Sequence, residues 1–280
     1  MENPSVARVH VQKVRNHQLL EADDALAVEE PLEIGLQYGS KDRLVTKAVS
    51  VTMRTPGHDQ ELALGFLWTE GIISRAGQVA RTSVLAGENK VVVTLNEHEV
   101  PALQPAERNF YTTSSCGVCG KASIGAIRTV SPYPGTPDQI AVAAGVFYGL
   151  EDELRKQQRL FASTGGLHAS ALFDLAGKLI MLREDVGRHN ALDKVIGAAL
   201  LEDALPLDRT ILLLSGRASF ELVQKATMAG IKLVAAVGAP SSLAVQLAQE
   251  AGMTLIGFLR HQGFNIYAGA HRVKAGLVVH

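Results

Sequence analysis

The chain has 280 residues, a length that corresponds to about two domains. Hydrophobic residues make up 47% and charged residues 20%, so the chain can bury a sizeable core and is not intrinsically disordered. Its formal charge of −1 provides no broad basic field for DNA or RNA, and no apolar run approaches the roughly 18 residues of a membrane helix, so neither partner is expected.

The first part of the chain predicts a small mixed α/β domain. Alternating apolar and polar residues predict strands at residues 8–14, 32–37, 47–55, 82–85 and 91–95, the last two as a hairpin. Asp59 can cap a helix that runs through residues 61–68. Residues 101–115 have no clear periodicity and contain two prolines. We therefore predict an N-terminal domain over residues 1–108 and a flexible loop and linker over residues 109–130.

Residues 131–280 predict a second domain in which strands and helices alternate. Strands are expected at residues 168–173, 178–183, 210–214, 231–237 and 253–259, the first two joined as a hairpin across residues 174–177, with a short extended tail at 265–268. Helices are expected at residues 136–158, 189–201, 220–228 and 241–252. Continuous apolar strands that alternate with helices predict a mostly parallel sheet covered on both faces.

Four successive strands of this domain end in loops rich in small residues, hydroxyl groups and arginine. The loops are residues 184–190, 215–219, 238–242 and 260–263, and they carry Arg188, Arg217 and Arg260. Ligands of such sheets bind beyond the carboxyl ends of the strands, and the first three loops also open helices, whose free N–H groups favour anions. The pattern predicts an anionic ligand such as a nucleotide. The alternative is ordinary helix caps whose arginines pair with Asp185 or Glu221.

Two histidines, His168 and His189, lie close to these loops in the sequence. Either could act as an acid–base group, although a lone histidine is more often a packed or surface residue. Strict phosphate motifs are absent, because Gly120-Lys121 is followed by Ala122 and no strand is followed by G-x-G-x-x-G. The anionic ligand is therefore inferred from the arginine loops alone.

The chain has two cysteines, Cys116 and Cys119, in one loop with Gly117, Gly120 and Lys121. These neighbours favour an accessible thiolate. A zinc site would be only half complete, since no other cysteines remain and no histidine pair has zinc spacing, so we expect no structural zinc. The pair is then either a dithiol redox centre or a carrier of persulfide sulfur, and composition ranks these two alternatives equally.

The start of the chain bears on the compartment. Residues 1–20 carry several charges and no apolar block, so no secretory signal is expected. We predict a cytoplasmic protein. In that reducing compartment a lone C-x-x-C is more often catalytic or metal-binding than a structural disulfide.

Several motifs are spread, in order, over nearly the whole chain. They are Cys116-Gly-Val-Cys-Gly120, Thr164-Gly-Gly-Leu-His168, Glu184-Asp-Val-Gly-Arg-His-Asn-Ala-Leu-Asp-Lys194, Ser215-Gly-Arg-Ala-Ser219, Ala239-Pro-Ser-Ser-Leu-Ala244, and Gly257-Phe-Leu-Arg260 followed by Asn265-Ile-Tyr267. Together they closely resemble the formate dehydrogenase accessory protein family, FdhD. The resemblance implies a three-layer α-β-α C-terminal domain similar to cytidine deaminases, with a smaller mixed α/β domain before it.

The same resemblance implies a sulfurtransferase that acts as a sulfur carrier. Such proteins take persulfide sulfur from a cysteine desulfurase and deliver it to the molybdenum bis-guanine-dinucleotide cofactor, which then enters formate dehydrogenase. The resemblance also implies that the protein forms a homodimer. Cys116 matches the persulfide-carrying cysteine and Cys119 its partner. The stretch associated with cofactor binding matches Phe258, Leu259, Arg260, His261, Gln262 and Gly263, with Arg188 and Arg217 as further candidates. GDP or GMP would mimic the cofactor.

The likeness to deaminases also argues against one activity. Zinc deaminases place H-x-E and P-C-x-x-C at two helix starts. The corresponding helix starts here read Gly187-Arg-His-Asn190 and Gly216-Arg-Ala-Ser219, which supply no zinc triad. We therefore expect no deamination. The alternatives to a sulfur carrier are a C-x-x-C dithiol oxidoreductase and a nucleotide-binding cofactor chaperone without sulfur transfer.

Overall fold

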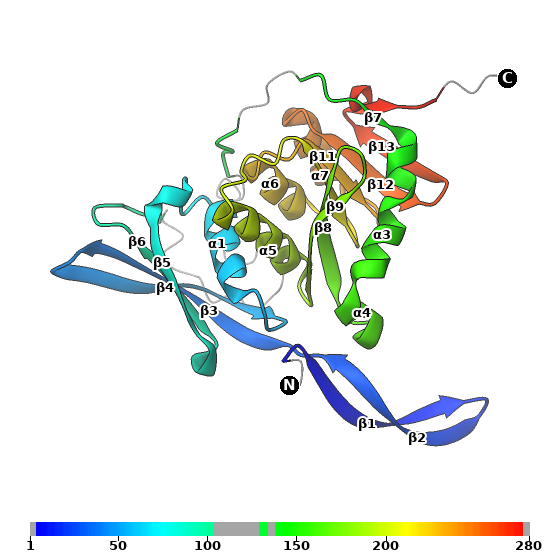
Figure 1. Cartoon of the computed structure of the whole chain (residues 1–280), viewed down its shortest axis with the longest axis horizontal. Helices are drawn as coiled ribbons and strands as arrows, with labels where there is room; N and C mark the ends of the chain where they lie inside the picture. Colours follow the sequence, from blue (N-terminus) through cyan, green and yellow to red (C-terminus); the bar gives the residue numbers. More distant parts are fainter. Residues whose placement is uncertain (1–3, 104–128, 134–137, 277–280) are drawn as a thin grey trace.

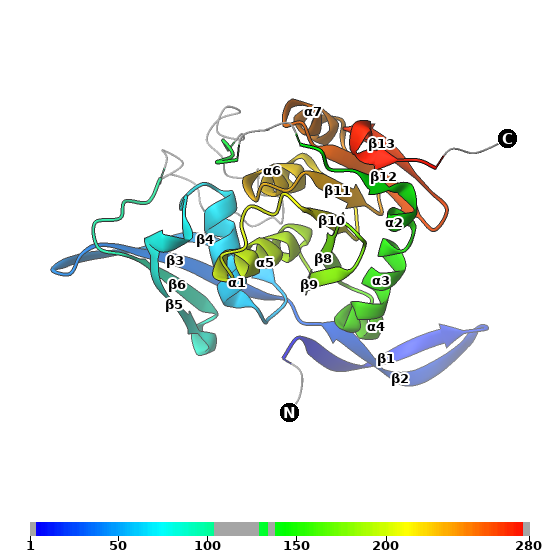
Figure 2. The same cartoon turned by 45° about the horizontal axis from the view of Figure 1, so that its top comes forward.

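The computed structural model describes residues 4–103, 129–133 and 138–276. Its centre is a six-stranded sheet in the order β13-β12-β11-β10-β8-β9. The strands are β8 (His168–Asp174), β9 (Leu179–Asp185), β10 (Thr210–Leu214), β11 (Leu233–Ala236), β12 (Thr254–Arg260) and β13 (Gly263–Ala268). Figures 1 and 2 show the helices around this sheet.

The central sheet is mixed, so the prediction of a mostly parallel sheet is wrong. β10 pairs in parallel with β11, and β11 with β12. The pairs β10–β8, β8–β9 and β12–β13 are antiparallel. The reason is local: both β8–β9 and β12–β13 are connected by short turns, and only antiparallel strands can be joined by so few residues.

Strand direction decides which loops meet. Because β8 runs against both β9 and β10, the strand β9 points the same way as β10, β11 and β12. The carboxyl ends of these four strands therefore lie at one edge of the sheet, as the sequence predicted. The amino end of β8, at His168, lies at the same edge because that strand is reversed.

Helices cover both faces of the central sheet, which confirms the three-layer α-β-α arrangement (Figure 1). One face carries α2 (Ala144–Tyr148) and α3 (Leu150–Gln157), whose buried side chains pack with Ala171 and Leu213 of the sheet. The other face carries α5 (Arg188–Leu201), α6 (Phe220–Met228) and α7 (Ser242–Glu250), which pack with the alternate residues Leu172 and Leu212. This alternation is the two-residue period of a strand buried on both sides.

The helix expected at residues 136–158 is the clearest error in this layer. Residues 142–143 instead form the short strand β7 (Val142–Ala143), which pairs with β14 (Val273–Lys274). Helical structure begins at Ala144, is divided at Gly149 and continues after α3 into α4 (Arg159–Thr164). Asp138 is held by the Arg272 guanidinium at 2.8 Å, a tertiary contact that fixes the chain before the helix.

The N-terminal unit is a second sheet with one helix, as predicted. Its strand order is β4-β3-β6-β5, with β3 (Glu30–Ser40), β4 (Arg43–Arg54), β5 (Val79–Leu85) and β6 (Lys90–Leu95), and its helix is α1 (Asp59–Thr69). The short 3-10 turns are Ala76–Gln78, Ala86–Glu88 and Ala270–Arg272. One hydrophobic cluster runs from Ile34 and Val91 of this sheet through Leu62 of α1 to Val195 of α5. The two sheets therefore share a core around α1 and α5.

Two glycines allow α1 and α5 to approach closely. A Cβ atom on Gly65 would lie 1.9 Å from the carbonyl oxygen of Asp193, and one on Gly197 would lie 1.8 Å from that of Glu61. Both distances are far below any real contact. Glycine is unfavourable inside a helix, so these positions are explained by the helix crossing rather than by helix propensity.

A two-stranded antiparallel ribbon precedes the sheets: its base lies against the end of α4, where Ala27 adjoins Gly166, and its turn projects outward (Figure 1). Its first strand, β1 (Val6–Arg15), was predicted, but β2 (Gln18–Ala27) was not. The segment 18–27 lacks β-branched residues, so propensity gave no signal. The strand forms by pairing with β1 across Asn16 and His17, which both have positive φ as in a type I′ hairpin turn.

Candidate functional site

The loops that follow β10 and β11 are joined backbone to backbone at the carboxyl edge of the sheet. Gly238 N donates to the Gly216 carbonyl at 2.8 Å, and Ser241 N donates to the Ala218 carbonyl at 3.0 Å. Ser241 also caps α7, because its hydroxyl accepts from Ala244 N. The two loops therefore form one rigid surface at the starts of α6 and α7.

The loop region of β12 packs directly onto this surface. Phe258 N donates to the Gly238 carbonyl at 3.1 Å. A Cβ atom on Gly257 would lie 2.7 Å from Pro240 Cδ, and one on Gly238 would lie 3.0 Å from Arg217, so both positions require glycine for space. We call the carboxyl ends of β9, β10, β11 and β12, with their loops, the strand-end edge.

The three predicted arginines lie along the strand-end edge. Arg217 is exposed beside Gly238. Arg260 uses its Nη1 to donate to the Val237 carbonyl at 2.8 Å and to that of Leu259 at 2.6 Å. Arg188 begins α5, and its buried Nε has no hydrogen-bond partner among the described residues.

These guanidinium groups are not neutralised by neighbouring carboxylates. Among the residues that the structure describes, neither Arg188, Arg217 nor Arg260 forms an ion pair, so pairing with Asp185 or Glu221 is not the explanation of their positions. The Glu221 carboxylate lies close enough to His189 and Arg188 for their charges to affect its pKa. Burial raises that pKa, but hydrogen bonds and the positive charges of His189 and Arg188 hold it below its ordinary value. The edge thus presents cationic groups to solvent or to a ligand.

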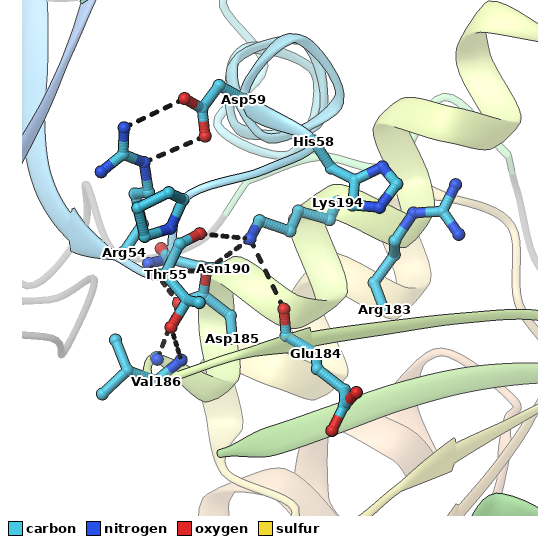
Figure 3. A network of polar contacts seen from close by, with 12 residues as sticks. Arg54, Thr55, His58, Asp59, Arg183, Glu184, Asp185, Val186, Asn190 and Lys194 are labelled. Atoms are coloured by element: carbon cyan, nitrogen blue, oxygen red, sulfur yellow. Dashed lines mark hydrogen bonds and ion pairs between the residues drawn. The ribbon is translucent and has the colours of Figure 1, made fainter. Parts of the chain in front are cut away.

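The motif 184–194 has a second, structural part that the sequence did not separate. Asp185 is fully buried and accepts four hydrogen bonds, from Gly187 N, Asn190 Nδ2, Thr55 N and Lys194 Nζ. The Lys194 ammonium lies 2.7 Å from the Asp185 carboxylate and 2.9 Å from the Thr55 carbonyl. Figure 3 shows these side chains between the end of β4 and the start of α5.

Asn190 completes this buried contact. Its Nδ2 donates to the Met53 carbonyl at 2.7 Å, and its Oδ1 accepts from the Thr52 hydroxyl at 3.1 Å. Each of these groups joins the N-terminal sheet to the strand-end edge. We call Thr55, Asp185, Asn190 and Lys194 the polar joint, and its role is to fix Arg188 relative to both sheets.

A second buried ion pair joins three helices of the shared core. Lys225 of α6 donates to Asp193 of α5 at 2.9 Å and to the Thr69 hydroxyl of α1 at 2.8 Å. Burial alone would lower the pKa of Lys225, but the carboxylates of Asp193 and Glu70 raise it, so the ammonium stays charged. Asp193 and Lys194 therefore serve packing, not a ligand.

His168 is a residue at the strand-end edge that the sequence interpretation left as a packed or surface histidine. It lies at the first position of β8, so the reversal of that strand brings it between the ends of β9 and β10. A Cβ atom on Gly216 would lie 3.4 Å from His168 Nδ1, so the ring lies against the loop after β10. The available signal was the 168–183 hairpin, which requires strand reversal.

The segment 258–263 is divided by the structure. Phe258 has φ of 52° and a side chain that is 47% exposed, an unusual combination for a large residue. Leu259 is fully buried in the core, so its position does not support ligand contact by its side chain. His261 and Gln262 form the turn before Gly263, and His261 lies 3.1 Å from Asp152 of α3. Phe258 and Arg260 are the members that adjoin the strand-end edge.

Cys116 and Cys119 lie outside the described residues. Within the described ranges, no group of three histidine, cysteine or acidic side chains is arranged to hold a metal ion. None of the helices described here has the length and apolar character needed to cross a bilayer.

Comparisons with known proteins agree with these motifs. A family model described as the FdhD/NarQ family matches residues 27–274. A "Sulfur carrier protein FdhD" from Mycolicibacterium paratuberculosis is 50% identical over 275 residues, covering 95% of this chain and 98% of its own. One of the same name from Streptomyces avermitilis is 49% identical and covers 95% of both chains.

A solved structure shares the fold. The crystal structure of a proposed formate dehydrogenase accessory protein from Desulfotalea psychrophila matches with a TM-score of 0.75 and 23% sequence identity. The match covers 97% of this chain and 100% of that one. The agreement therefore extends to both sheets and to the ribbon-bearing end of the molecule.

Proposed function

The chain belongs to the FdhD/NarQ family, and from that premise we propose that it is a sulfur carrier for formate dehydrogenase. It takes persulfide sulfur from a cysteine desulfurase and passes it to the molybdenum bis-guanine-dinucleotide cofactor before that cofactor enters the dehydrogenase. The supporting observation is near 50% identity, along almost the whole chain, to relatives that are named sulfur carrier proteins.

Cys116 is the proposed sulfur-carrying residue. Its thiolate attacks the outer sulfur of the desulfurase persulfide, a new S–S bond forms, and the donor cysteine leaves as a thiolate. Cys119 then attacks the inner sulfur of Cys116, so that the outer sulfur leaves as hydrosulfide with the bonding electron pair and a disulfide remains. A cellular dithiol must reduce that disulfide before the next cycle. The molybdenum cofactor is the substrate that accepts the sulfur.

The strand-end edge is the proposed site for the guanine-nucleotide part of the cofactor. Arg188, Arg217 and Arg260 supply guanidinium groups without carboxylate partners among the described residues, and the starts of α5 and α6 supply backbone N–H groups. Phe258 presents an exposed ring to the same region and offers a stacking surface for a base. GDP is therefore the probe of choice for this edge.

Mass spectrometry of the protein after incubation with a cysteine desulfurase and cysteine tests sulfur carrying directly. We expect the mass of one sulfur atom to be added at Cys116, retained in Cys119→Ala and lost in Cys116→Ala. Labelling that survives Cys116→Ala would refute the assignment. A dithiol oxidoreductase would instead reduce a model disulfide and require both cysteines equally.

A test in cells distinguishes a sulfur carrier from a nucleotide-binding cofactor chaperone without sulfur transfer. Replacement of both cysteines should abolish activation of formate dehydrogenase if sulfur is carried. Activation that persists without either thiol would identify a nucleotide-binding chaperone. We also propose a cytoplasmic homodimer, and light scattering of the purified protein at several concentrations checks the dimer.

A further inference from the structure

At the strand-end edge, Arg188 and Arg217 are separated by the width of one strand, because β8 lies between β9 and β10. β8 lies between β9 and β10, and neighbouring strands are about 4.8 Å apart, so the ends of β9 and β10 are separated by roughly 10 Å. Arg188 follows the first of these ends and Arg217 the second. The residue that occupies the intervening position is His168.

The backbone around His168 is fixed to the loop after β10. Ala169 N donates to the Ser215 hydroxyl at 2.8 Å, and Ser215 N donates to the Ala169 carbonyl at 3.0 Å. These two bonds fix the backbone next to the ring, and a Cβ atom on Gly216 would be in van der Waals contact with the ring, at 3.4 Å from Nδ1. The imidazole is thus held in place, yet no hydrogen bond of its ring nitrogens occurs within the described residues.

Two further polar atoms near His168 are also without partners in the described part of the chain. They are the hydroxyl of Ser170, a residue only 1% exposed, and Nε of Arg188. Ser170 lies two positions after His168 in β8, so its side chain is on the same face as Leu172, which packs in the cluster that contains α5 and α6. A buried hydroxyl without a partner is uncommon in proteins, and it points to a missing ligand or water.

We propose that His168 is a ligand-binding residue of this site: it bridges the gap between Arg188 and Arg217, contacts a phosphate group of the bound nucleotide, and takes up a proton when that phosphate binds. This inference rests on the proposed function, since it assumes that the strand-end edge binds a phosphorylated ligand. It adds a residue and a pH dependence that the arginine pattern alone does not contain.

The electrostatic surroundings support proton uptake. Burial and the positive charge of Arg188 lower the pKa of His168, while the carboxylate of Asp185 opposes that shift, so the imidazole is neutral at pH 7 in the free protein. The other charged or titratable groups near this part of the edge are His189, in the first turn of α5, Arg217, after Gly216, and Glu221, in the first turn of α6. A bound phosphate adds negative charge beside the ring and therefore raises its pKa.

Linkage fixes the direction of the effect. A group whose pKa is higher in the complex than in the free protein makes binding tighter as the pH falls, and a rise of one pKa unit corresponds to about a tenfold change in affinity. GDP affinity of the wild-type protein should therefore increase as the pH falls from 8 to 6, by at most about tenfold for each unit by which the bound phosphate raises the pKa of His168. The phosphate of GDP also titrates near pH 6, so the comparison must be made between protein variants with the same ligand.

The test is isothermal titration of the full-length protein with GDP at several pH values. His168→Gln keeps a hydrogen-bonding group but cannot titrate, so its affinity should change less with pH and should be about tenfold weaker than wild type at pH 6. His271→Gln, which is exposed just after β13 at the opposite edge of the sheet, is the matched control and should behave like wild type. A His168→Gln profile that superimposes on the wild-type profile would overturn the proposal.

Proton uptake by the wild-type protein gives a second measurement that does not depend on a variant that folds. Titrations near pH 6.5 in two buffers of different ionisation enthalpy should show more proton uptake than the titration of GDP itself explains, and an absence of that excess overturns the proposal. If GDP fails to bind wild type at all, the His168 inference and the nucleotide site both fail. If GDP binds with proton uptake but Cys116 is never labelled, only sulfur carrying fails.

Discussion

The polar joint and the strand-end edge both contain residues of the motif 184–194, yet the charged groups of the joint are buried and paired and those of the edge are not. In the joint, Asp185 and Lys194 are almost completely buried and each is paired. At the edge, Arg188 and Arg217 are more accessible and make no ion pair with a described residue. Both sets come from loops that looked alike as sequence. The state of pairing, not the residue type, separates a structural group from a candidate binding group.

The physical reason is the cost of removing charge from water. A buried charge is tolerated only when paired and hydrogen-bonded, so a satisfied group such as Asp185 has no capacity left for a ligand. An accessible guanidinium keeps that capacity. The comparison predicts that joint variants lose stability, whereas edge variants lose ligand affinity and keep their stability.

The largest expected effect is at the joint. Lys194→Ala leaves the Asp185 carboxylate buried without its cation, which should lower the free energy of unfolding by about 3–5 kcal/mol. Urea denaturation followed by circular dichroism measures the change. Lys13→Ala, which removes the partly exposed Lys13–Asp24 ion pair of the ribbon, is the control and should cost less than about 1 kcal/mol. A loss of similar size in both variants would contradict the distinction.

The next effect concerns the helix crossing beneath the joint. Gly197→Ala would place a methyl group 1.8 Å from the Glu61 carbonyl oxygen, so α1 and α5 must separate, and we expect a cost of about 1–3 kcal/mol or more. Gly145→Ala in α2 is the matched control, because nothing lies within 4 Å of its new methyl group and alanine favours helix. Thermal unfolding should show a clear decrease for the first variant and none for the second.

A substitution at the strand-end edge should weaken ligand binding without lowering the stability of the protein. Arg217→Ala removes an exposed guanidinium and should weaken GDP binding by about tenfold, with no change in melting temperature. Arg209→Ala, exposed directly before β10 at the opposite edge of the sheet, controls for the loss of one positive charge. Unchanged GDP affinity in Arg217→Ala would remove this residue from the site. A lowered melting temperature would place it with the joint.

Local signals predicted much of this fold. Helix α6 begins and ends at the predicted residues 220 and 228, and α7 lies within the predicted range 241–252. The features that local sequence signals did not predict depend on contacts with distant parts of the chain. β2 exists because β1 lies beside it, and residues 138–143 are not helical because Arg272 holds Asp138 and β14 pairs with residues 142–143.

The candidate site shows the same limit. The gathering of the arginine loops followed from strand direction and was predicted correctly. The division of the motif 184–194 into joint and edge required the partners Thr55 and Met53, which are more than a hundred residues away in sequence. His168 was considered as an acid–base group but was not placed at this edge, although the predicted hairpin of residues 168–183, which the structure confirms, already implied it. Residue types could be read from the sequence, but the contacts between distant residues could not be predicted from it.

The smallest effect lies at the border of the joint, where Glu61 of α1 meets Arg183 of β9. The two side chains form a bidentate contact at 2.6 and 2.8 Å, with His58 at 3.2 Å from the carboxylate (Figure 3 labels Arg183 and His58). Burial works to raise the pKa of Glu61, but the Arg183 hydrogen bond and the His58 contact lower it to about 2. The ionised carboxylate thus stabilises the folded state at neutral pH.

The pH window of that stabilisation follows from the direction of the shift. It is fully present above the ordinary pKa of 4.5 and is lost as the pH falls towards about 2. Because both side chains are partly exposed to solvent, we expect only about 1 kcal/mol. Glu61→Gln should therefore be less stable than wild type at pH 7, and the difference should shrink between pH 4.5 and pH 2. Urea midpoints across this range test it, with the exposed Glu29→Gln as control, and a difference that does not change with pH would show that packing, rather than charge, holds Glu61 at the border.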